Sequence, residues 1–389
     1  MNYRKKMCFI MLFVMFINLI PVSAFAQDPN ALNINAKAAV LMEPRTGKII
    51  IEHNPNEKLP PASVTKIMTL LLIYEAIDQG KIKWDDMVTT SAYAANMGGS
   101  QIFLEPGELQ NVRDLTKSIS VSSANDASVA MAEFLSGSEE GFVLSMNNKA
   151  KELGMNNTNF VNASGLDTQG HVTSALDIAI MSRELMTKYP EVHEMATIWM
   201  DTIIHKTARG EEEFGLSNTN RLLRTYQGAT GLKTGSTSEA LYCISATAKR
   251  GELELIAVIL GSPDSVTRFD EARKLLDYGF ANYAIAKGDP AGTDKGEVLV
   301  NKGQEEKVRV IVKEEISVLM PKGNNIALES RIELLDSLDA PAKAGTKAGE
   351  VIYIANGNEI GRSDLVTAED VERITIDRMF IRLLNRWFG

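Results

Sequence analysis

The chain of 389 residues carries a net charge of −9 at pH 7, with 44% hydrophobic and 23% charged residues. These values are ordinary for a globular protein, and the length suggests more than one domain. The acidic balance argues against a nucleic-acid partner, because a phosphate-binding face needs a surplus of Lys and Arg.

The N-terminus has the features of an export signal. Basic residues at positions 4–6 precede an apolar run over 7–20, and Ala24-Phe25-Ala26 forms a small-x-small cleavage pattern. An uncleaved anchor is the alternative, but the run is short for a span of about 20 residues. We therefore predict that residues 1–26 are a signal peptide, that cleavage follows Ala26, and that the protein is exported.

Cleavage would remove Cys8 and leave Cys243 as the single cysteine of the mature chain. One thiol cannot form an internal disulfide, and the sequence has no Cys or His cluster typical of a metal site. We predict that Cys243 is a small core residue of a strand.

Residues 27–287 alternate between strand-like and helical patterns. Two apolar runs flank Pro44-Arg45-Thr46-Gly47 and predict a β-hairpin over 38–42 and 48–52. Helices are predicted from Pro61 to about Gly80 and over 111–121, 126–135, 138–153, 174–188 and 269–286. Later strands are predicted over 231–235, 241–248 and 253–260. This order indicates an α+β fold in which one antiparallel sheet is covered by helices.

A change of composition over 287–295, where Gly, Asp and Pro gather, indicates a linker. Residues 296–375 then predict a small β-rich domain, with strands over 308–312, 316–320 and 350–354. That domain has no catalytic constellation, so we expect an accessory role.

Residues 376–389 form a basic amphipathic pattern. Arginines recur every four residues at 378, 382 and 386, among the apolar residues Met379, Phe380, Leu383, Leu384, Trp387 and Phe388. Such a helix is too short to cross a bilayer, but it could lie at a membrane surface with its arginines against anionic lipid. Docking on its own domain is the alternative.

Ser63 and Lys66 lie one turn apart if a helix begins just after Pro61, so the hydroxyl and the amine share a face. A serine needs such a base nearby to become a nucleophile. Alone, this pair is more typical of a solvated helix start. The polar segment from Ser122 to Asn125, between two predicted helices, would by itself indicate helix capping.

Three motifs together change both interpretations. Ser63-Val64-Thr65-Lys66, Ser123-Ala124-Asn125 and Lys233-Thr234-Gly235 follow the order S-x-x-K, S-D-N and K-T-G that marks penicillin-binding proteins and class A β-lactamases. The chain resembles the low-molecular-mass penicillin-binding proteins, the serine-type D-alanyl-D-alanine carboxypeptidases of peptidase family S11. The resemblance covers nearly the whole chain, from the export signal to the terminal helix. It implies a penicillin-binding, β-lactamase-like catalytic domain.

The resemblance also implies roles in acyl transfer. Ser63 would be the nucleophile and would carry the acyl group as an ester. Lys66 would be the base, kept neutral by burial and by the like charge of Lys233. Ser123 would relay a proton from Lys66 toward the leaving amine.

The remaining motif residues would bind the substrate. Asn125 would hydrogen-bond the substrate amide or the lysine base, and Lys233 and Thr234 would bind the terminal carboxylate. Gly235 would leave room for the substrate to lie along its strand. By family analogy, the backbone N–H groups of the nucleophile and of Ser236 would form the oxyanion hole.

The implied substrate is a peptidoglycan stem peptide ending in D-Ala-D-Ala, and β-lactams would acylate the same serine as inhibitors. The resemblance implies no metal or other cofactor, and it implies a place at the outer face of the cytoplasmic membrane or in the cell envelope. Some relatives carry a histidine at the position of Ser236, which puts deacylation and substrate preference in question. His171 lies in a segment that resembles a family loop near the cleft, and we expect a structural role for it.

Two other classes of function stay open at the level of sequence. One is a β-lactamase or transpeptidase of the same fold, although a class A β-lactamase would need an additional deacylating carboxylate. The other is a penicillin-sensing or peptidoglycan-binding protein with vestigial hydrolysis, although a pure binder needs no activated serine.

Overall fold

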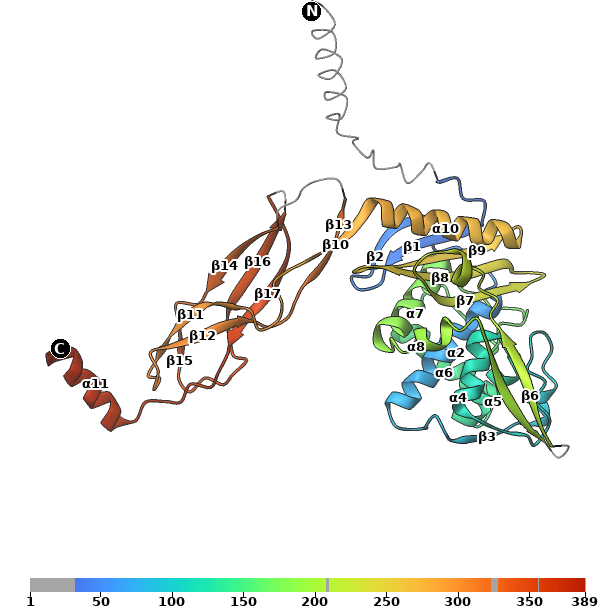
Figure 1. Cartoon of the computed structure of the whole chain (residues 1–389), viewed down its shortest axis with the longest axis horizontal. Helices are drawn as coiled ribbons and strands as arrows, with labels where there is room; N and C mark the ends of the chain where they lie inside the picture. The colour runs from blue at the N-terminus through green and yellow to red at the C-terminus, as the bar shows by residue number, and fades with distance from the viewer. Residues whose placement is uncertain (1–31, 208–209, 323–327, 356, 389) are drawn as a thin grey trace, which may run out of the picture.

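The computed structural model describes residues 32–207, 210–322, 328–355 and 357–388, so the predicted signal peptide lies outside the described residues. Figure 1 shows a larger body of helices packed on a sheet and an elongated body of strands, with one helix at its far end. The mixture of helix and sheet confirms the predicted α+β class.

An antiparallel sheet with the strand order β2-β1-β9-β8-β7 lies at the centre of the larger body. Its strands are β1 (Ala38–Glu43), β2 (Lys48–His53), β7 (Ala229–Thr237), β8 (Leu241–Arg250) and β9 (Leu253–Ser262). Side chains alternate between the faces of a strand, so Val40 and Val258 enter one apolar core while Leu41 and Ala257 enter another. Both faces are thereby covered by helices, as predicted.

Helices form the core on one face of this sheet. They are the 3₁₀ turn η2 (Ala62–Thr65) and the α-helices α2 (Lys66–Asp78), α3 (Ala92–Ala95), α4 (Val112–Val121), α5 (Asn125–Ser136), α6 (Glu139–Glu152), α7 (Ala175–Lys188) and α8 (Val192–Ala196). The short helix α9 (Leu222–Thr225) lies on the other face, where Leu222 enters the second core. The side chains of Asn111, Ser138 and Ser174 cap α4, α6 and α7 by accepting a backbone N–H. These helices confirm the predicted ones, except that the chain after Pro61 first makes a 3₁₀ turn and that Asn125 begins α5.

Two strand pairs were not predicted. The first pairs β3 (Met87–Thr89) with β4 (Leu109–Asn111), and the second pairs β5 (Met200–Thr207) with β6 (Gly210–Ser217). Most β6 side chains are exposed, so this strand lacks the alternating apolar pattern from which a strand is predicted.

The predicted helix over 269–286 was wrong at its C-terminal end. The helix is α10 (Ser265–Asn282), and the next residues form β10 (Tyr283–Lys287). β10 pairs with β13 (Ser317–Pro321), a strand of the elongated body. Helix propensity therefore yields at Tyr283 to pairing with a strand more than thirty residues away.

The elongated body contains a sheet with the order β14-β16-β17-β12-β11-β15. Its strands are β11 (Asp294–Asn301), β12 (Lys307–Val312), β14 (Glu329–Leu334), β15 (Ser337–Asp339), β16 (Lys347–Ala355) and β17 (Asn358–Thr367). Val310, Val351 and Leu365 are fully buried in its separate core. These elements confirm the β-rich character that the sequence predicts.

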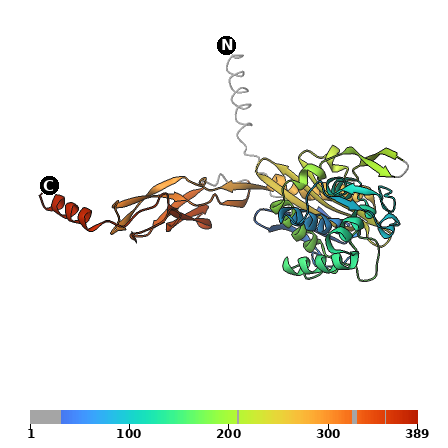
Figure 2. The same cartoon turned by 90° about the horizontal axis from the view of Figure 1, so that it is seen from below.

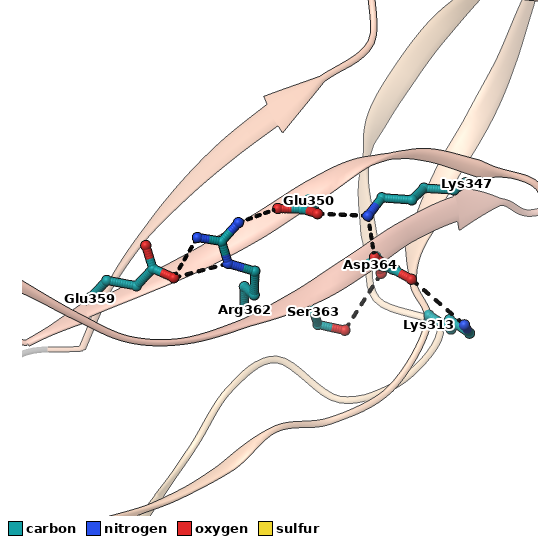
Figure 3. A network of polar contacts seen from close by, with 7 residues as sticks. All are labelled: Lys313, Lys347, Glu350, Glu359, Arg362, Ser363 and Asp364. Carbon is teal, nitrogen blue, oxygen red and sulfur yellow. Dashed lines mark hydrogen bonds and ion pairs between the residues drawn. The ribbon is translucent and has the colours of Figure 1, made fainter.

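An ion-pair ladder, formed by Lys347, Glu350, Glu359, Arg362 and Asp364, crosses β16 and β17 (Figure 3). Lys347 contacts both Glu350 and Asp364, and Arg362 contacts both Glu350 and Glu359, at 2.6–2.8 Å. The charges lie on an exposed face of the sheet, so each one has both a partner and water.

The helix α11 (Ile376–Phe388) lies at the end of the elongated body that is farther from the larger body (Figure 2). Ile376 and Trp387 are each 88% exposed. Arg378 donates to the side chain of Gln304, and Arg382 donates to the carbonyl oxygens of Gly303 and Gln304. None of the helices in the described ranges is long and apolar enough to cross a membrane.

Candidate active site

The three sequence motifs meet at one cavity of about 410 Å³. Its walls include Ser63 from η2, Ser123 from the turn before α5, and Thr234, Gly235 and Ser236 from β7. The other predicted site residues, Lys66, Asn125 and Lys233, are buried next to these walls. A larger cavity of about 500 Å³ lies between Phe103 and the β5–β6 hairpin, and none of the motif residues lines it.

The 3₁₀ turn brings the nucleophile candidate to its base candidate. In a 3₁₀ turn, residues i and i+3 lie directly above one another, and the Lys66 Nζ to Ser63 Oγ distance is 3.0 Å. The predicted one-turn spacing therefore holds, although the turn is tighter than the α-helical one expected.

The Lys66 amine is fully buried and has two further partners. Nζ lies 2.6 Å from Asn125 Oδ1 and 2.6 Å from the Ser164 carbonyl oxygen. The Asn125 amide nitrogen donates to the Gly98 carbonyl at 2.6 Å, which turns its oxygen toward Lys66. Both partners can only accept hydrogen bonds. A neutral amine would give them its two N–H bonds and direct its lone pair at the Ser63 hydroxyl.

The electrostatics of the site favour that neutral amine. Burial, and then the charge of Lys233, lower the pKa of Lys66 well below its usual range, while the charge of Asp126 raises it. Asp126 is itself held by the backbone N–H groups of Ile102, Leu104 and Ala127. These N–H donors partly offset the negative charge of Asp126, so its effect on the pKa of Lys66 is reduced.

Ser123 has a strained backbone and a buried hydroxyl without a partner. Its φ is +61°, in the left-handed region that non-glycine residues rarely occupy. Within the described part of the chain, Ser123 Oγ makes no hydrogen bond, although it is buried at the cavity wall. A buried hydroxyl of this kind is free to exchange a proton with a ligand in the cavity.

On β7, Lys233 and Gly235 are fixed by close packing. Burial, and then the charge of Arg268, lower the pKa of Lys233 to about 7. A Cβ on Gly235 would lie 2.8 Å from the Ser63 backbone nitrogen. The absence of a side chain at Gly235 therefore leaves room for η2.

Sequence reasoning missed Arg268, which enters the cavity from the first turn of α10. Its guanidinium donates to the carbonyls of Gly235 and Cys243 at 3.1 and 3.3 Å. It brings a further buried cation to the wall that carries Thr234. The sequence places Arg268 more than thirty residues from the nearest motif, so no local pattern could identify it.

His171 contacts the 3₁₀ turn η2, which carries Ser63. Its Nδ1 accepts the Val161 N–H at 3.0 Å, and its Nε2 lies 2.8 Å from Thr65 Oγ1. Since Nδ1 accepts, Nε2 carries the ring proton and donates to Thr65. Burial lowers the pKa of His171 to about 4, which keeps the ring neutral. These contacts agree with the expected structural role.

Cys243 lies on β8 directly opposite Gly235, is fully buried, and has a free thiol. Burial raises its pKa to about 11. This confirms the prediction of a core residue in a strand.

Comparison with known proteins agrees with this geometry. Residues 24–264 match the family model described as D-alanyl-D-alanine carboxypeptidase (peptidase S11), and residues 284–373 match the C-terminal domain of penicillin-binding protein 5. The chain is 41% identical to the D-alanyl-D-alanine carboxypeptidase DacF of Bacillus subtilis, over 99% of this chain and 98% of the relative.

Solved structures agree as well. Penicillin-binding protein 5 from Haemophilus influenzae is 34% identical, with a TM-score of 0.73, over 87% of this chain and 98% of that one. Penicillin-binding protein D2 from Listeria monocytogenes in its ampicillin-bound form is 35% identical, with a TM-score of 0.54, over 64% of this chain and 99% of that one. The chain therefore belongs to the peptidase S11 family of D-alanyl-D-alanine carboxypeptidases, which are serine hydrolases.

Proposed function

We propose that this carboxypeptidase removes the terminal D-alanine of peptidoglycan stem peptides through an ester of Ser63, with Lys66 as the base. The observation that carries the proposal is the environment of the Lys66 amine. Two carbonyl oxygens accept its N–H bonds at 2.6 Å, and its third neighbour is the Ser63 hydroxyl at 3.0 Å. A base held in this way is already directed at the proton it must remove.

Acylation then follows from the positions of the side chains. The Ser63 hydroxyl gives its proton to Lys66 while Oγ attacks the carbonyl carbon of the penultimate D-alanine. The N–H groups of Ser63 and Ser236 would stabilise the oxyanion, and β7 passes next to the Ser63 amide, as the Gly235 contact requires. The peptide C–N bond then breaks, and Ser123 delivers the proton from Lys66 to the leaving amine.

The terminal carboxylate of the substrate would bind at Lys233 and Thr234, with Arg268 adding positive charge on the same wall. This recognition selects a free C-terminus, which is what a carboxypeptidase requires. Water then hydrolyses the ester and restores the Ser63 hydroxyl. β-Lactams would acylate the same oxygen, in keeping with the ampicillin-bound state of the Listeria relative.

The test is release of D-alanine by the full-length exported protein from a peptide ending in Lys-D-Ala-D-Ala, together with labelling by a fluorescent penicillin. Ser63→Ala should abolish both signals. The matched control is Ser128→Ala, a buried serine whose hydroxyl donates to the Ala124 carbonyl, and it should retain both. Labelling of Ser63→Ala would overturn the nucleophile assignment, and labelling of the wild type without D-alanine release would favour a penicillin sensor.

We further propose that residues 1–26 direct export, that 27–287 form the catalytic domain and 296–375 an accessory domain, and that 376–389 associate with the outer face of the membrane. The apolar side chains of α11 support the last point, because Phe380, Leu383 and Trp387 are all exposed. Arg378 and Arg382 contact residues 303–304, so the first turns of α11 are fixed to the accessory domain.

Deletion of residues 376–389 should release the protein from vesicles that contain anionic lipid, as measured by sedimentation with the vesicles. Trp387→Ala combined with Phe380→Ala should weaken binding in the same direction without removing the arginines. Equal sedimentation of the full-length and shortened chains would show that α11 does not hold the protein at the membrane.

A further inference from the structure

One wall of the catalytic cavity comes from none of the three motifs. It is formed by Trp199, by residues 217–219, and by Arg221. Trp199 is half-buried and presents the only aromatic ring that this wall contributes to the cavity. A large, flat side chain at the edge of a small substrate site can exclude bulky parts of a ligand by steric overlap.

Several contacts fix the position of this indole. Trp199 stands just before β5, at the base of the hairpin where Met200 pairs with Ser217. The Asn218 backbone N–H donates to the Trp199 carbonyl at 2.9 Å, and its side chain donates to the Ile198 carbonyl at 2.8 Å. The Arg224 guanidinium carbon lies 5.4 Å from the centre of the indole ring. The ring is therefore held from its backbone and from one face.

Two hydrogen bonds connect the two ends of this wall to motif segments of the catalytic site. The Ser217 N–H donates to the Ser122 hydroxyl at 3.2 Å, next to Ser123. At the other end of the wall, the hydroxyls of Thr219 and Thr234 are hydrogen-bonded to each other. The wall thus spans the space between Ser123 and Thr234.

In the proposed function, on which this step rests, that space holds the residue to be released. Ser123 protonates the amine of the leaving residue, and Thr234 binds its carboxylate. Both groups belong to the same terminal amino acid, so its side chain must lie next to the wall between Ser123 and Thr234. Trp199 is the bulkiest residue of that wall.

We propose that Trp199 limits the size of the C-terminal residue that the enzyme releases, and so restricts it to small D-amino acids such as D-alanine. Trp199 is then a specificity-determining residue, and Arg224 is a positioning residue for the indole. Because the backbone of Trp199 is hydrogen-bonded and its ring is stacked by Arg224, a larger side chain would meet the indole and be disfavoured by steric overlap.

The test compares two peptides that differ only in the last residue, one ending in D-Ala-D-Ala and the other in D-Ala-D-Leu. For each enzyme variant, the ratio of kcat/KM for the D-Leu peptide to that for the D-Ala peptide is measured. Trp199→Ala should raise this ratio about tenfold or more, in line with the usual effect of a few methylene groups in a pocket. Trp199→Phe should give an intermediate ratio.

The matched control is Trp84→Ala. Trp84 is also half-buried and is also stacked by an arginine, with the Arg113 guanidinium carbon 5.2 Å from the ring centre, but it packs on Tyr74 rather than on the cavity. Its replacement should leave the ratio at the wild-type value, whatever it does to stability.

An equal change of kcat/KM for both peptides in Trp199→Ala would overturn the proposal, as would an equal rise of the ratio in Trp84→Ala. Failure of the proposed function has a different signature. In that case Ser63→Ala would still release D-alanine, and the ratio of the two kcat/KM values would then not describe a reaction at Ser63.

Discussion

The candidate active-site cavity and the ion-pair ladder of the elongated body differ in whether their charged groups have partners of opposite charge. In the cavity, Lys66, Lys233 and Arg268 are buried, and in the described ranges none of them forms an ion pair with a carboxylate. In the ladder, Lys347 and Arg362 are exposed and each contacts two carboxylates (Figure 3).

The difference shows how burial changes the effect of a charged group. An unpaired cation in a dry site costs free energy, and lowering the pKa is the way in which a lysine avoids that cost. The same lowered pKa turns a lysine into a base. Exposed pairs gain little from their partners, because water and salt screen them. The buried cations of the cavity therefore lower the stability of the fold but can make Lys66 a base. The exposed pairs of the ladder change stability little.

The largest effect should follow from removal of the buried base. Lys66→Gln keeps a polar side chain but has no lone pair of comparable basicity, so the rate of acylation by penicillin should fall by about 10²–10⁴-fold. In the wild type, acylation should slow as the pH falls through the lowered pKa of Lys66, because the protonated amine cannot accept the serine proton. Stopped-flow acylation across pH measures both effects.

Lys149 provides the control, since it is a buried lysine that is paired with Glu75 and Glu152 and lies away from the cavity. Lys149→Gln should acylate at the wild-type rate per folded molecule. A comparable loss in both variants would mean that any buried lysine matters equally, and the contrast between the two regions would fail.

A smaller effect should appear in the acid stability of the larger body. The folded-state pKa of His171 is about 4, against an ordinary value of 6.5, so the unfolded chain takes up the proton first. Above pH 6.5 this histidine is neutral in both states and costs no stability. As the pH falls from 6.5 toward 4, protonation of the unfolded chain lowers the free energy of unfolding, by about 3 kcal/mol at pH 4.

His171→Gln removes this titration, so the difference in unfolding free energy between pH 6.5 and pH 4 should shrink. Urea unfolding followed by tryptophan fluorescence reports on the larger body, because Trp84 and Trp199 both lie there. A pH dependence identical to that of the wild type would show that His171 titrates normally.

The smallest effect should follow from breaking the ladder. Arg362→Ala removes the contacts to Glu350 and Glu359, yet the unfolding midpoint of the accessory domain should barely change, because every member of the pairs is solvated. Circular dichroism across a thermal or urea transition measures this.

Leu365→Ala is the comparison within the same sheet. Leu365 is fully buried in the domain core, so its truncation should cost about 2–5 kcal/mol. A loss of similar size for Arg362→Ala would assign the ladder a structural importance that exposed pairs do not normally have.

The sequence was sufficient where chemistry is encoded by spacing. The motifs predict that Ser63, Lys66 and Lys233 lie close together, and the structure brings them to one cavity, because a motif fixes each group at its place in a turn or strand whatever the loop lengths between motifs. The hairpin over 38–52 and the capped helices were predictable for a similar reason, since turn residues and caps act locally.

The rest depends on the path of the chain in space. The Ser164 carbonyl that accepts from Lys66 is a backbone group, and any residue type could supply it. Arg268 and Trp199 reach the cavity from elements whose positions are set by packing. β10 continues a helical pattern in sequence and becomes a strand only because β13 offers hydrogen bonds.

The junction between α10 and β10 has one further consequence. The helix ends at Asn282 and the strand begins at Tyr283, and Lys322 donates to the Asn282 and Phe280 carbonyls across the joint. These hydrogen bonds and the β10–β13 pairing join the two bodies directly at this point. If α11 rests on the membrane as proposed, the elongated body lies between the lipid and the cavity (Figure 2), so reach as well as recognition would decide which layer of the wall is trimmed.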